Sequence, residues 1–141
     1  MTTKYIEAVL EIETQNFSQP WTAGMFLSEL ENPNAAYFAA VEDEVLLGYG
    51  GLLNIAGEGH VTNIAVQKQH MGKGLGRHIL SHLEQTAKEQ GCFMITLEVR
   101  QSNAAALGLY KSFGFLQCGI RKDYYQHPIE DAVIMSKELV L

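Results

Sequence analysis

The first half of the chain changes from a helical to a strand-like spacing of apolar residues. Apolar residues recur every three or four positions within 5–17, which predicts a first helix. Pro20 is expected to interrupt it, because proline disfavours helical backbone at the residue before it. Thr22 is suited to cap a second helix over 23–32. Apolar runs bounded by turn residues then predict strands at 36–42, 45–54 and 59–66, the first two forming a hairpin.

The second half alternates helices and strands. An apolar stripe along 75–90 predicts an amphipathic helix, which Gly91 ends. A strand at 93–99 follows, and joining it to 59–66 through that helix favours two parallel strands with a right-handed crossover. The expected fold is therefore α/β, with one mixed sheet and its ligands at the carboxyl ends of the parallel strands. The remaining expected elements are a helix at 103–113, capped by Asn103 and ended by Gly114, and strands at 115–125 and 130–141.

Length and composition restrict the class of protein. The 141 residues are enough for one domain, 1–141, with a core of its own. The sequence lacks the long apolar run of a transmembrane helix and the basic-then-apolar order of a signal peptide. We therefore expect a cytoplasmic protein without a membrane partner. Cys92 and Cys118 are expected to be free thiols, because disulfides are rare in that compartment.

Charge is distributed unevenly along the chain. The net charge is −6, with one basic and nine acidic residues in 1–60 and nine basic and seven acidic residues in 61–141. A phosphate-bearing ligand would favour the second half and a cationic partner the first, although chance surface charge gives the same pattern. An acidic chain argues against direct nucleic-acid binding, which depends on basic patches.

The segment "MGKGLG" (71–76) spaces three glycines two apart and leads into the helix at 75–90. Backbone N–H groups of such a loop, and of the first helical turn, can bind an anion where no Cβ atom keeps it away. Lys73 and Arg77 add positive charge on either side. A purely structural turn remains the alternative.

Three phosphate-binding motifs compete for this loop. A P-loop requires Ser or Thr after Gly72-Lys73, where the chain has glycine. A dinucleotide fingerprint requires its third glycine at a different position. The loop instead resembles the acyl-CoA loop of the GNAT acetyltransferases, with Met71 where glutamine or arginine is usual. A second register, starting at Gln69, stays open.

Its position marks Glu98 as a candidate catalytic residue, whereas Tyr110 becomes one only through a family resemblance. Glu98 stands in the middle of a strand whose neighbours are apolar, where a carboxylate needs a specific reason. A strand-end ion pair is the alternative for Glu98, and a core aromatic the alternative for Tyr110. Glu58 and His60 are weaker candidates for a general base. His78 and His82 have the i, i+4 spacing of metal ligands but no acidic partner, so no metal is expected.

The stretch "LEVRQSNAAALGLYKSFGF" is similar to the RimI-type branch of the GNAT superfamily, the ribosomal-protein N-terminal acetyltransferases. "FSQPW", "TNIAV" and "IRKDYY" match as well, so the resemblance covers about residues 5–137 in the right order. It implies the GNAT fold, a central sheet with splayed parallel strands flanked by about four helices. Relatives begin with a full strand, whereas only five residues precede the first helix here, so that strand is expected to be short or absent.

The resemblance also implies acetyl-CoA as co-substrate and assigns residues to it. The backbone of Ile64, Ala65 and Val66 would pair with the pantetheine arm, and an N–H near Val66 would stabilise the oxyanion. Asn103 would contact the cofactor, in addition to capping its helix. The pyrophosphate would be held by Gly72, Lys73, Gly74, Leu75, Gly76 and Arg77.

For the reaction, the resemblance implies Glu98 as general base and Tyr110 as general acid. The acceptor would be the N-terminal peptide of a protein, usually the N-terminal alanine of a small-subunit ribosomal protein. Two alternatives stay open, a small-molecule amine acetyltransferase and a non-catalytic module that binds acetyl-CoA. The residues expected to contact the peptide are Phe17, Trp21, Arg121, Tyr124 and Tyr125.

Overall fold

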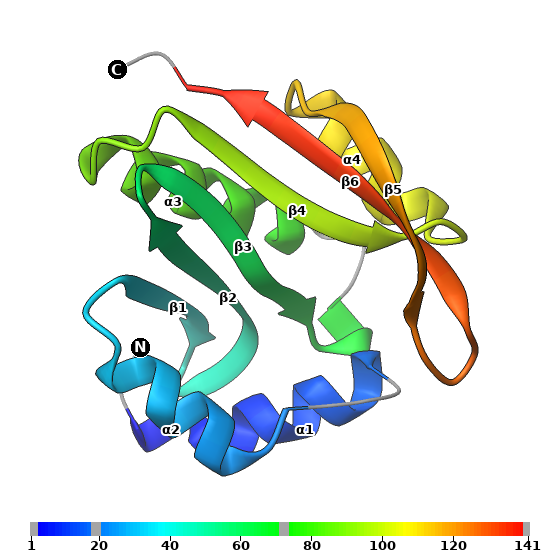
Figure 1. The fold of residues 1–141 in the computed structure, drawn as a ribbon. Helices are drawn as coiled ribbons and strands as arrows, with labels where there is room; N and C mark the ends of the chain where they lie inside the picture. The colour runs from blue at the N-terminus through cyan, green and yellow to red at the C-terminus, as the bar shows by residue number, and fades with distance from the viewer. Residues whose placement is uncertain (1–2, 18–20, 71–73, 140–141) are drawn as a thin grey trace.

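The computed structural model describes residues 3–17, 21–70 and 74–139 (Figure 1). Within them lie two short 3₁₀ segments, Thr3–Tyr5 and Lys68–His70. The helices are α1 (Ile6–Asn16), α2 (Ala23–Glu31), α3 (Leu75–Glu89) and α4 (Ala104–Ser112), and the strands are β1 (Ala35–Glu42), β2 (Val45–Ile55), β3 (Glu58–Val66), β4 (Met94–Arg100), β5 (Leu116–Tyr125) and β6 (Glu130–Glu138).

All six strands form one mixed sheet in the order β1-β2-β3-β4-β6-β5. Among neighbouring strands in the described residues, only β3 and β4 run parallel, and they pair over three residues from Glu58 and Met94 to His60 and Thr96. Beyond that point β3 continues with β2 and β4 with β6, and the two strands diverge. The predicted α/β fold with splayed parallel strands is therefore confirmed.

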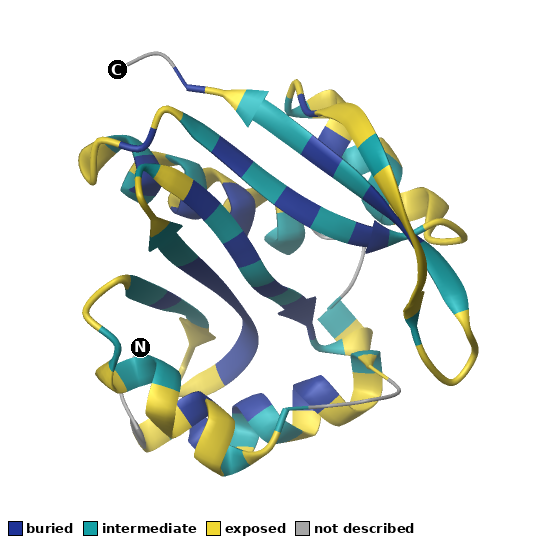
Figure 2. Cartoon of the chain, in the orientation of Figure 1, coloured by how far each residue is buried: buried dark blue, intermediate teal, exposed yellow. Residues whose placement is uncertain are grey.

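Helices cover both faces of this sheet and create two hydrophobic cores. On one face, α1 and α2 pack against β1–β3 around Val9, Ile12, Phe26 and Tyr49. On the other, α3 and α4 pack over the larger core, which contains Leu83. Along β4, buried residues alternate with less buried ones (Figure 2), since successive side chains point to opposite faces.

Local sequence signals explain most element boundaries. The Thr22 hydroxyl accepts a hydrogen bond from the Met25 N–H and caps α2, as predicted. Gly91 follows α3 with a φ of +78°, a conformation that glycine adopts without strain. Among the described residues, no strand precedes α1, which agrees with the expectation of a short or absent first strand. Pro20, expected to end α1, lies outside the described residues.

A β-bulge at Thr62 changes the direction of the side chains in the second half of β3. Gly51 of β2 pairs with Asn63 and Leu52 pairs with Val61, so Thr62 is the extra residue. Val61 faces the core under α3, whereas Asn63 reaches Glu13 on α1. The bulge therefore turns Asn63 to the face that α1 covers.

No helix within residues 3–17, 21–70 and 74–139 combines the length and the apolar character needed to cross a bilayer. Cys92 is buried and Cys118 exposed, and both are free thiols, as expected.

Candidate active site

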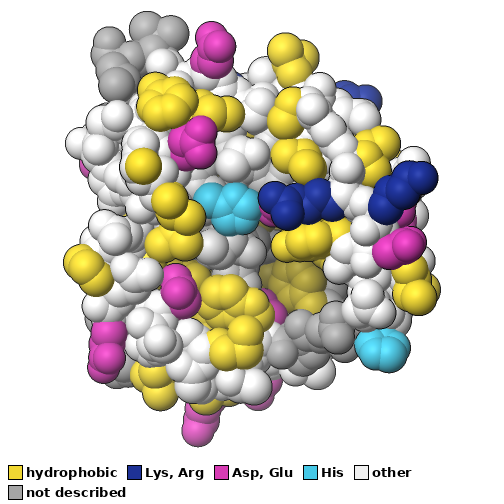
Figure 3. Space-filling model, viewed as in Figure 1, with side chains coloured by type: hydrophobic (Ala, Val, Ile, Leu, Met, Phe, Trp, Pro, Cys, Tyr) yellow, Lys and Arg dark blue, Asp and Glu magenta, His cyan; other side chains and the backbone are white. Residues whose placement is uncertain are grey.

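The divergence of β3 and β4 opens a cavity of about 270 Å³, here called the first cavity. Figure 3 shows a hollow on this face of the molecule, with hydrophobic side chains in it and histidine, lysine or arginine side chains at its edge. The first cavity is lined by Glu13, Asn16, Phe17, Trp21, His60, Val61, Thr62, Asn63, Ile64, Leu97, Glu98, Val99, Arg100, Asn103, Tyr110, Tyr124 and Tyr125.

Glu98 projects from β4 into the first cavity, on the face opposite the buried Leu97 and Val99. Its side chain is 11% exposed. His60 Nε2 lies 3.2 Å from Glu98 Oε2, and Arg121 Nε lies 3.6 Å from Oε1. The hydrogen bond from His60 lowers the pKa of Glu98, partial burial opposes that shift, and the positive charge of Arg121 adds to it. Glu98 is therefore an ionised carboxylate, able to accept a proton, at neutral pH.

Tyr110 reaches the same cavity from the opposite side of the sheet. It belongs to α4, is buried in the larger core and stacks obliquely on Phe115 at 5.9 Å between ring centroids. Burial raises the pKa of Tyr110 to about 12. Its hydroxyl thus keeps its proton at physiological pH. A carboxylate and a neutral phenol consequently face one cavity from the two sides of the splayed strands.

A second cavity, of about 370 Å³, continues along the start of α3. Asn16 and Ile64 line both cavities, so the two are neighbours. Of the residues predicted to bind the co-substrate, Ile64, Ala65, Val66, Gly74, Leu75, Gly76 and Arg77 line the second cavity. Gly72 and Lys73 lie outside the described residues.

Gly74 shows why glycine is required at the start of α3. Its φ is +81°, and a Cβ atom built on it meets no described atom within 4 Å. Strain in the backbone, and not crowding by the protein, therefore opposes a side chain here. The open space beside this residue and the N-terminus of the fifteen-residue helix α3 together fit a phosphate group.

The backbone of β3 also presents donors to the splay. The Gln67 N–H donates to the Leu47 carbonyl on β2. Because successive peptide groups of a strand point to opposite edges, the preceding Val66 N–H points to the open edge facing β4. This placement fits the oxyanion role that the resemblance implied for an N–H near Val66.

Two of the predicted ligand-binding side chains already have protein partners. Arg77 Nη2 donates to Ser112 Oγ at 2.9 Å, and its guanidinium lies 5.0 Å from the centroid of the Phe113 ring. Asn103 Oδ1 caps α4 by accepting from the Ala106 N–H, while the residue also lines the first cavity. Arg77 thus ties the start of α3 to the end of α4.

Four of the five predicted peptide-binding residues line the first cavity. These four are Phe17, Trp21, Tyr124 and Tyr125. The fifth, Arg121, contacts the cavity residue Glu98, and its guanidinium lies 5.8 Å from the ring centroid of Tyr124. Residues from the α1–α2 connection and from β5 therefore line the same cavity as Glu98.

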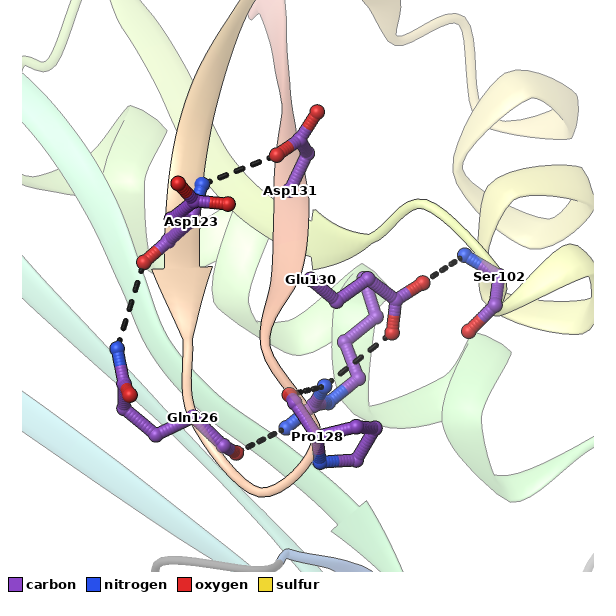
Figure 4. A network of polar contacts seen from close by, with 7 residues as sticks. Ser102, Asp123, Gln126, Pro128, Glu130 and Asp131 are labelled. Atoms are coloured by element: carbon purple, nitrogen blue, oxygen red, sulfur yellow. Dashed lines mark hydrogen bonds and ion pairs between the residues drawn. The ribbon is translucent and has the colours of Figure 1, made fainter.

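Arg100 fastens the β5–β6 turn to the end of β4. Figure 4 shows its partners Gln126, Pro128 and Glu130 at this turn. Its guanidinium donates to the carbonyls of Gln126 and Pro128 and to the Glu130 carboxylate, and it lies 4.5 Å from the ring centroid of Tyr125. The Glu130 carboxylate also accepts from the Ser102 N–H at 2.5 Å. The position of Tyr125 in the cavity wall thus depends on a charged side chain of β4.

Sequence reasoning missed several polar residues of the first cavity, and two of them, Glu13 and Asn63, are buried. Glu13 is 1% exposed on α1, and Asn63 is 7% exposed on β3. Glu13 lies on the apolar face of α1, and an acidic residue on that face is the signal in the sequence that could have indicated a buried carboxylate. Asn63 gave no signal, because only the bulge at Thr62 turns it toward α1. His60, a weaker candidate, is a direct partner of Glu98, whereas Glu58, the first residue of β3, is exposed.

His78 and His82 contact each other on α3, with ring centroids 4.8 Å apart. Across the described part of the chain, no three His, Cys, Asp or Glu side chains gather in a way that would hold a metal ion.

Comparison with known proteins agrees with this geometry. Residues 6–115 match the family model of the acetyltransferase (GNAT) family. The chain is 42% identical, over 92% of its length and 87% of the relative's, to a putative [ribosomal protein bS18]-alanine N-acetyltransferase of Bacillus subtilis. It is 33% identical, over 93% of its length and 89% of the relative's, to the [ribosomal protein bS18]-alanine N-acetyltransferase of Escherichia coli.

A solved structure of similar shape is the ribosomal-protein-S18-alanine N-acetyltransferase from Escherichia coli. It has a TM-score of 0.90 and 31% identity, with 100% of this chain and 92% of that chain covered. The family match spans most of the chain, and the similarity to these relatives extends over nearly all of it. The chain therefore belongs to the acetyltransferase (GNAT) family, as an N-acetyltransferase of the RimI type.

Proposed function

We propose that this protein transfers the acetyl group of acetyl-CoA to the N-terminal α-amine of a protein, with the N-terminal alanine of ribosomal protein bS18 as its acceptor. The observation that carries the proposal is the placement of Glu98 and Tyr110 on opposite sides of one cavity between splayed strands. The relatives in Bacillus subtilis and Escherichia coli, whose names specify bS18 alanine, support the acceptor.

The two cavities suit the two substrates. The second cavity, with Gly74 and the start of α3, offers backbone donors to the pyrophosphate of acetyl-CoA. The open edge of β3 offers the Val66 N–H to the thioester oxygen. The first cavity then receives the acceptor beside Glu98, against the aromatic side chains of Trp21 and Tyr125.

The reaction is the attack of a neutral amine on the thioester carbonyl. The C–N bond forms, the C–S bond breaks, the amine proton passes to Glu98 directly or through a water, and the departing thiolate receives the Tyr110 proton. Deprotonating an α-amine at pH 7 costs about 1 kcal/mol, whereas a lysine side chain costs roughly 4.6 kcal/mol. A single carboxylate with a lowered pKa is therefore better matched to an α-amine.

His60 strengthens the case for Glu98. Its hydrogen bond to Oε2 orients the carboxylate and keeps it ionised, while Oε1 stays available on the side of Arg121. Because Nε2 already carries the proton of this hydrogen bond, His60 holds the carboxylate in place and does not itself receive the amine proton at that nitrogen. We assign His60 a supporting role in proton removal and Glu98 the role of base.

The direct test is incubation of the protein with acetyl-CoA and one of three acceptors. The first is a peptide that begins with alanine and has the sequence of the bS18 N-terminus. The second is the same peptide with its α-amine blocked, and the third is a polyamine. We expect free-thiol release with the unblocked peptide alone, and a mass increase of one acetyl group on its α-nitrogen. Turnover with the polyamine alone would replace the proposal by the small-amine function. Cofactor-induced stabilisation without thiol release from any acceptor would indicate a binding module.

A further inference from the structure

Asn63 presents an unusual polar group to the first cavity. The residue is 7% exposed and lines the cavity wall formed by β3. Its Oδ1 atom is buried and has no hydrogen-bond partner among the residues that the structure describes. Buried side-chain oxygens are nearly always hydrogen-bonded in folded proteins, so this carbonyl calls for a donor.

Glu13 determines which end of the Asn63 amide faces the cavity. The Glu13 carboxylate accepts hydrogen bonds from the Tyr49 hydroxyl, from Asn63 Nδ2 at 3.4 Å and from the Trp21 N–H at 2.7 Å. Burial and the neighbouring carboxylate raise the pKa of Tyr49, so its hydroxyl keeps its proton and donates. Because the amide nitrogen of Asn63 is the donor to Glu13 Oε1, the NH₂ group of Asn63 faces Glu13. The carbonyl oxygen of Asn63 is thereby directed away from Glu13.

The position of Asn63 along β3 indicates which donor it meets. His60, the partner of Glu98, lies three residues earlier on the same strand, roughly 10 Å away at the usual rise per residue. The reacting nitrogen has to lie at Glu98. The next donor along a peptide acceptor is the main-chain N–H of its second residue, one residue length away from the reacting nitrogen. This N–H can reach Asn63 when the peptide runs along β3 in the direction from His60 to Asn63.

We propose that Asn63 Oδ1 accepts a hydrogen bond from the main-chain N–H of the acceptor's second residue, and that Glu13 is the positioning residue that orients the Asn63 amide. The inference rests on the proposed function, since it requires a peptide acceptor. It deepens that function by assigning a specificity-determining contact. An acceptor without a donor at that place leaves a buried carbonyl unpaired, and sites built in this way reject such analogues strongly.

The test replaces a single atom of the acceptor. Two peptides begin with alanine and differ only in the bond between residues 1 and 2, which is an amide in one and an ester in the other. The ester removes the N–H without adding bulk. We expect the wild-type kcat/KM to be at least tenfold lower with the ester peptide, at a pH where both α-amines are neutral.

The variant Asn63→Ala removes the proposed acceptor. We expect it to lower kcat/KM for the amide peptide by about the same factor and to treat the two peptides alike. Thr62→Val, a neighbouring polar-to-apolar change whose hydroxyl already bonds to Tyr37 at 3.1 Å, should keep the wild-type ratio between the peptides. Glu13→Gln should bring the rates with the amide and the ester peptide closer together, because a glutamine can donate to Asn63 and so allow its amide to turn by about 180°. In Asn63→Ala the difference between the two peptides should disappear.

Several results would overturn the proposal. Equal rates of the wild type with the amide and the ester peptide would overturn the proposal. This result needs no variant, so it holds even if Asn63→Ala does not fold. An unchanged ratio in a folded Asn63→Ala, with wild-type stabilisation by acetyl-CoA, would overturn it as well. In both cases acetylation of the amide peptide would leave the proposed function intact. Failure of the wild type to acetylate either peptide would refute the proposed function, and this inference with it.

Discussion

His60 Nε2 and Glu98 Oε2 are 3.2 Å apart, on two strands whose backbones pair for the last time at His60 and Thr96. The side-chain contact thus lies where β3 and β4 begin to diverge. This contact lowers the pKa of the Glu98 carboxyl, which lines the first cavity. It also gives the first prediction.

Replacing His60 should raise the pKa of Glu98. In the wild type the hydrogen bond from His60 is the largest cause of the lowered value, and Arg121 contributes less. Titration of the Glu98 side-chain carboxyl carbon by NMR should therefore show a midpoint below the ordinary glutamate range. We expect a higher midpoint in His60→Phe and a smaller increase in Arg121→Gln, the matched control. An unchanged midpoint in His60→Phe would mean that the two side chains do not interact in solution.

Tyr110 should act as the general acid that protonates the departing thiolate. Since burial raises its pKa to about 12, raising the pH from 8 to 10 should not remove the acid, and the wild-type rate should not fall over that range through this residue. Tyr110→Phe should lose about 10²-fold or more in kcat, in line with general acid catalysis, and keep its affinity for acetyl-CoA. Steady-state rates with equilibrium binding of acetyl-CoA check both points, and near wild-type turnover in this variant would remove Tyr110 from the mechanism.

Gly74 and Gly91 form a matched pair for testing the glycine loop. Both have positive φ, +81° and +78°, and a Cβ atom on either meets no described atom within 4 Å. Gly74→Ala and Gly91→Ala should each lower the free energy of unfolding by about 1 kcal/mol, because alanine is strained there. Only Gly74→Ala should also weaken binding of acetyl-CoA, measured by calorimetry. Equal binding by both variants would place the pyrophosphate elsewhere.

Arg100 should control peptide binding through the β5–β6 turn. Arg100→Met keeps the length of the side chain but removes the donors to Gln126, Pro128 and Glu130. We expect a higher KM for the peptide acceptor, with little change in the KM for acetyl-CoA, because Tyr125 loses its support. Glu130→Gln keeps the shape of the network and should show a smaller effect of the same kind. Equal increases in both KM values would indicate general unfolding of the site.

Much of the fold followed from spacing alone. The stripe on α3, the Thr22 cap and the strand–helix–strand unit each rest on local physics, so β3, α3 and β4 were predicted within a residue or two of their bounds. Glu98 became a candidate through one anomaly, its charge between apolar neighbours in a strand, whereas Tyr110 became one only through the family resemblance. The role of Glu98 also came from that resemblance, since a strand-end ion pair gives the same pattern.

Other parts of the site could not be predicted because they depend on tertiary contacts. The bulge at Thr62, which turns Asn63 toward α1, arises from the pairing of β2 with β3. The same is true of Glu13, whose burial is tolerated only because Tyr49, Asn63 and the Trp21 backbone all donate to it. Arg77 was expected to face a phosphate, and its contacts with Ser112 and Phe113 became visible only once α4 was placed beside α3.

The central claim is that Glu98 removes the proton of the attacking amine. Glu98→Gln preserves the size of the side chain and can still hydrogen-bond to His60, but it cannot take a proton. The decisive measurement is the single-turnover rate of acetyl transfer to an alanine-starting peptide, with acetyl-CoA and peptide affinities determined on the same sample. We predict that the rate falls by about 10²–10⁴-fold while both affinities stay within about threefold of wild type. A wild-type rate in this variant would contradict the mechanism proposed here.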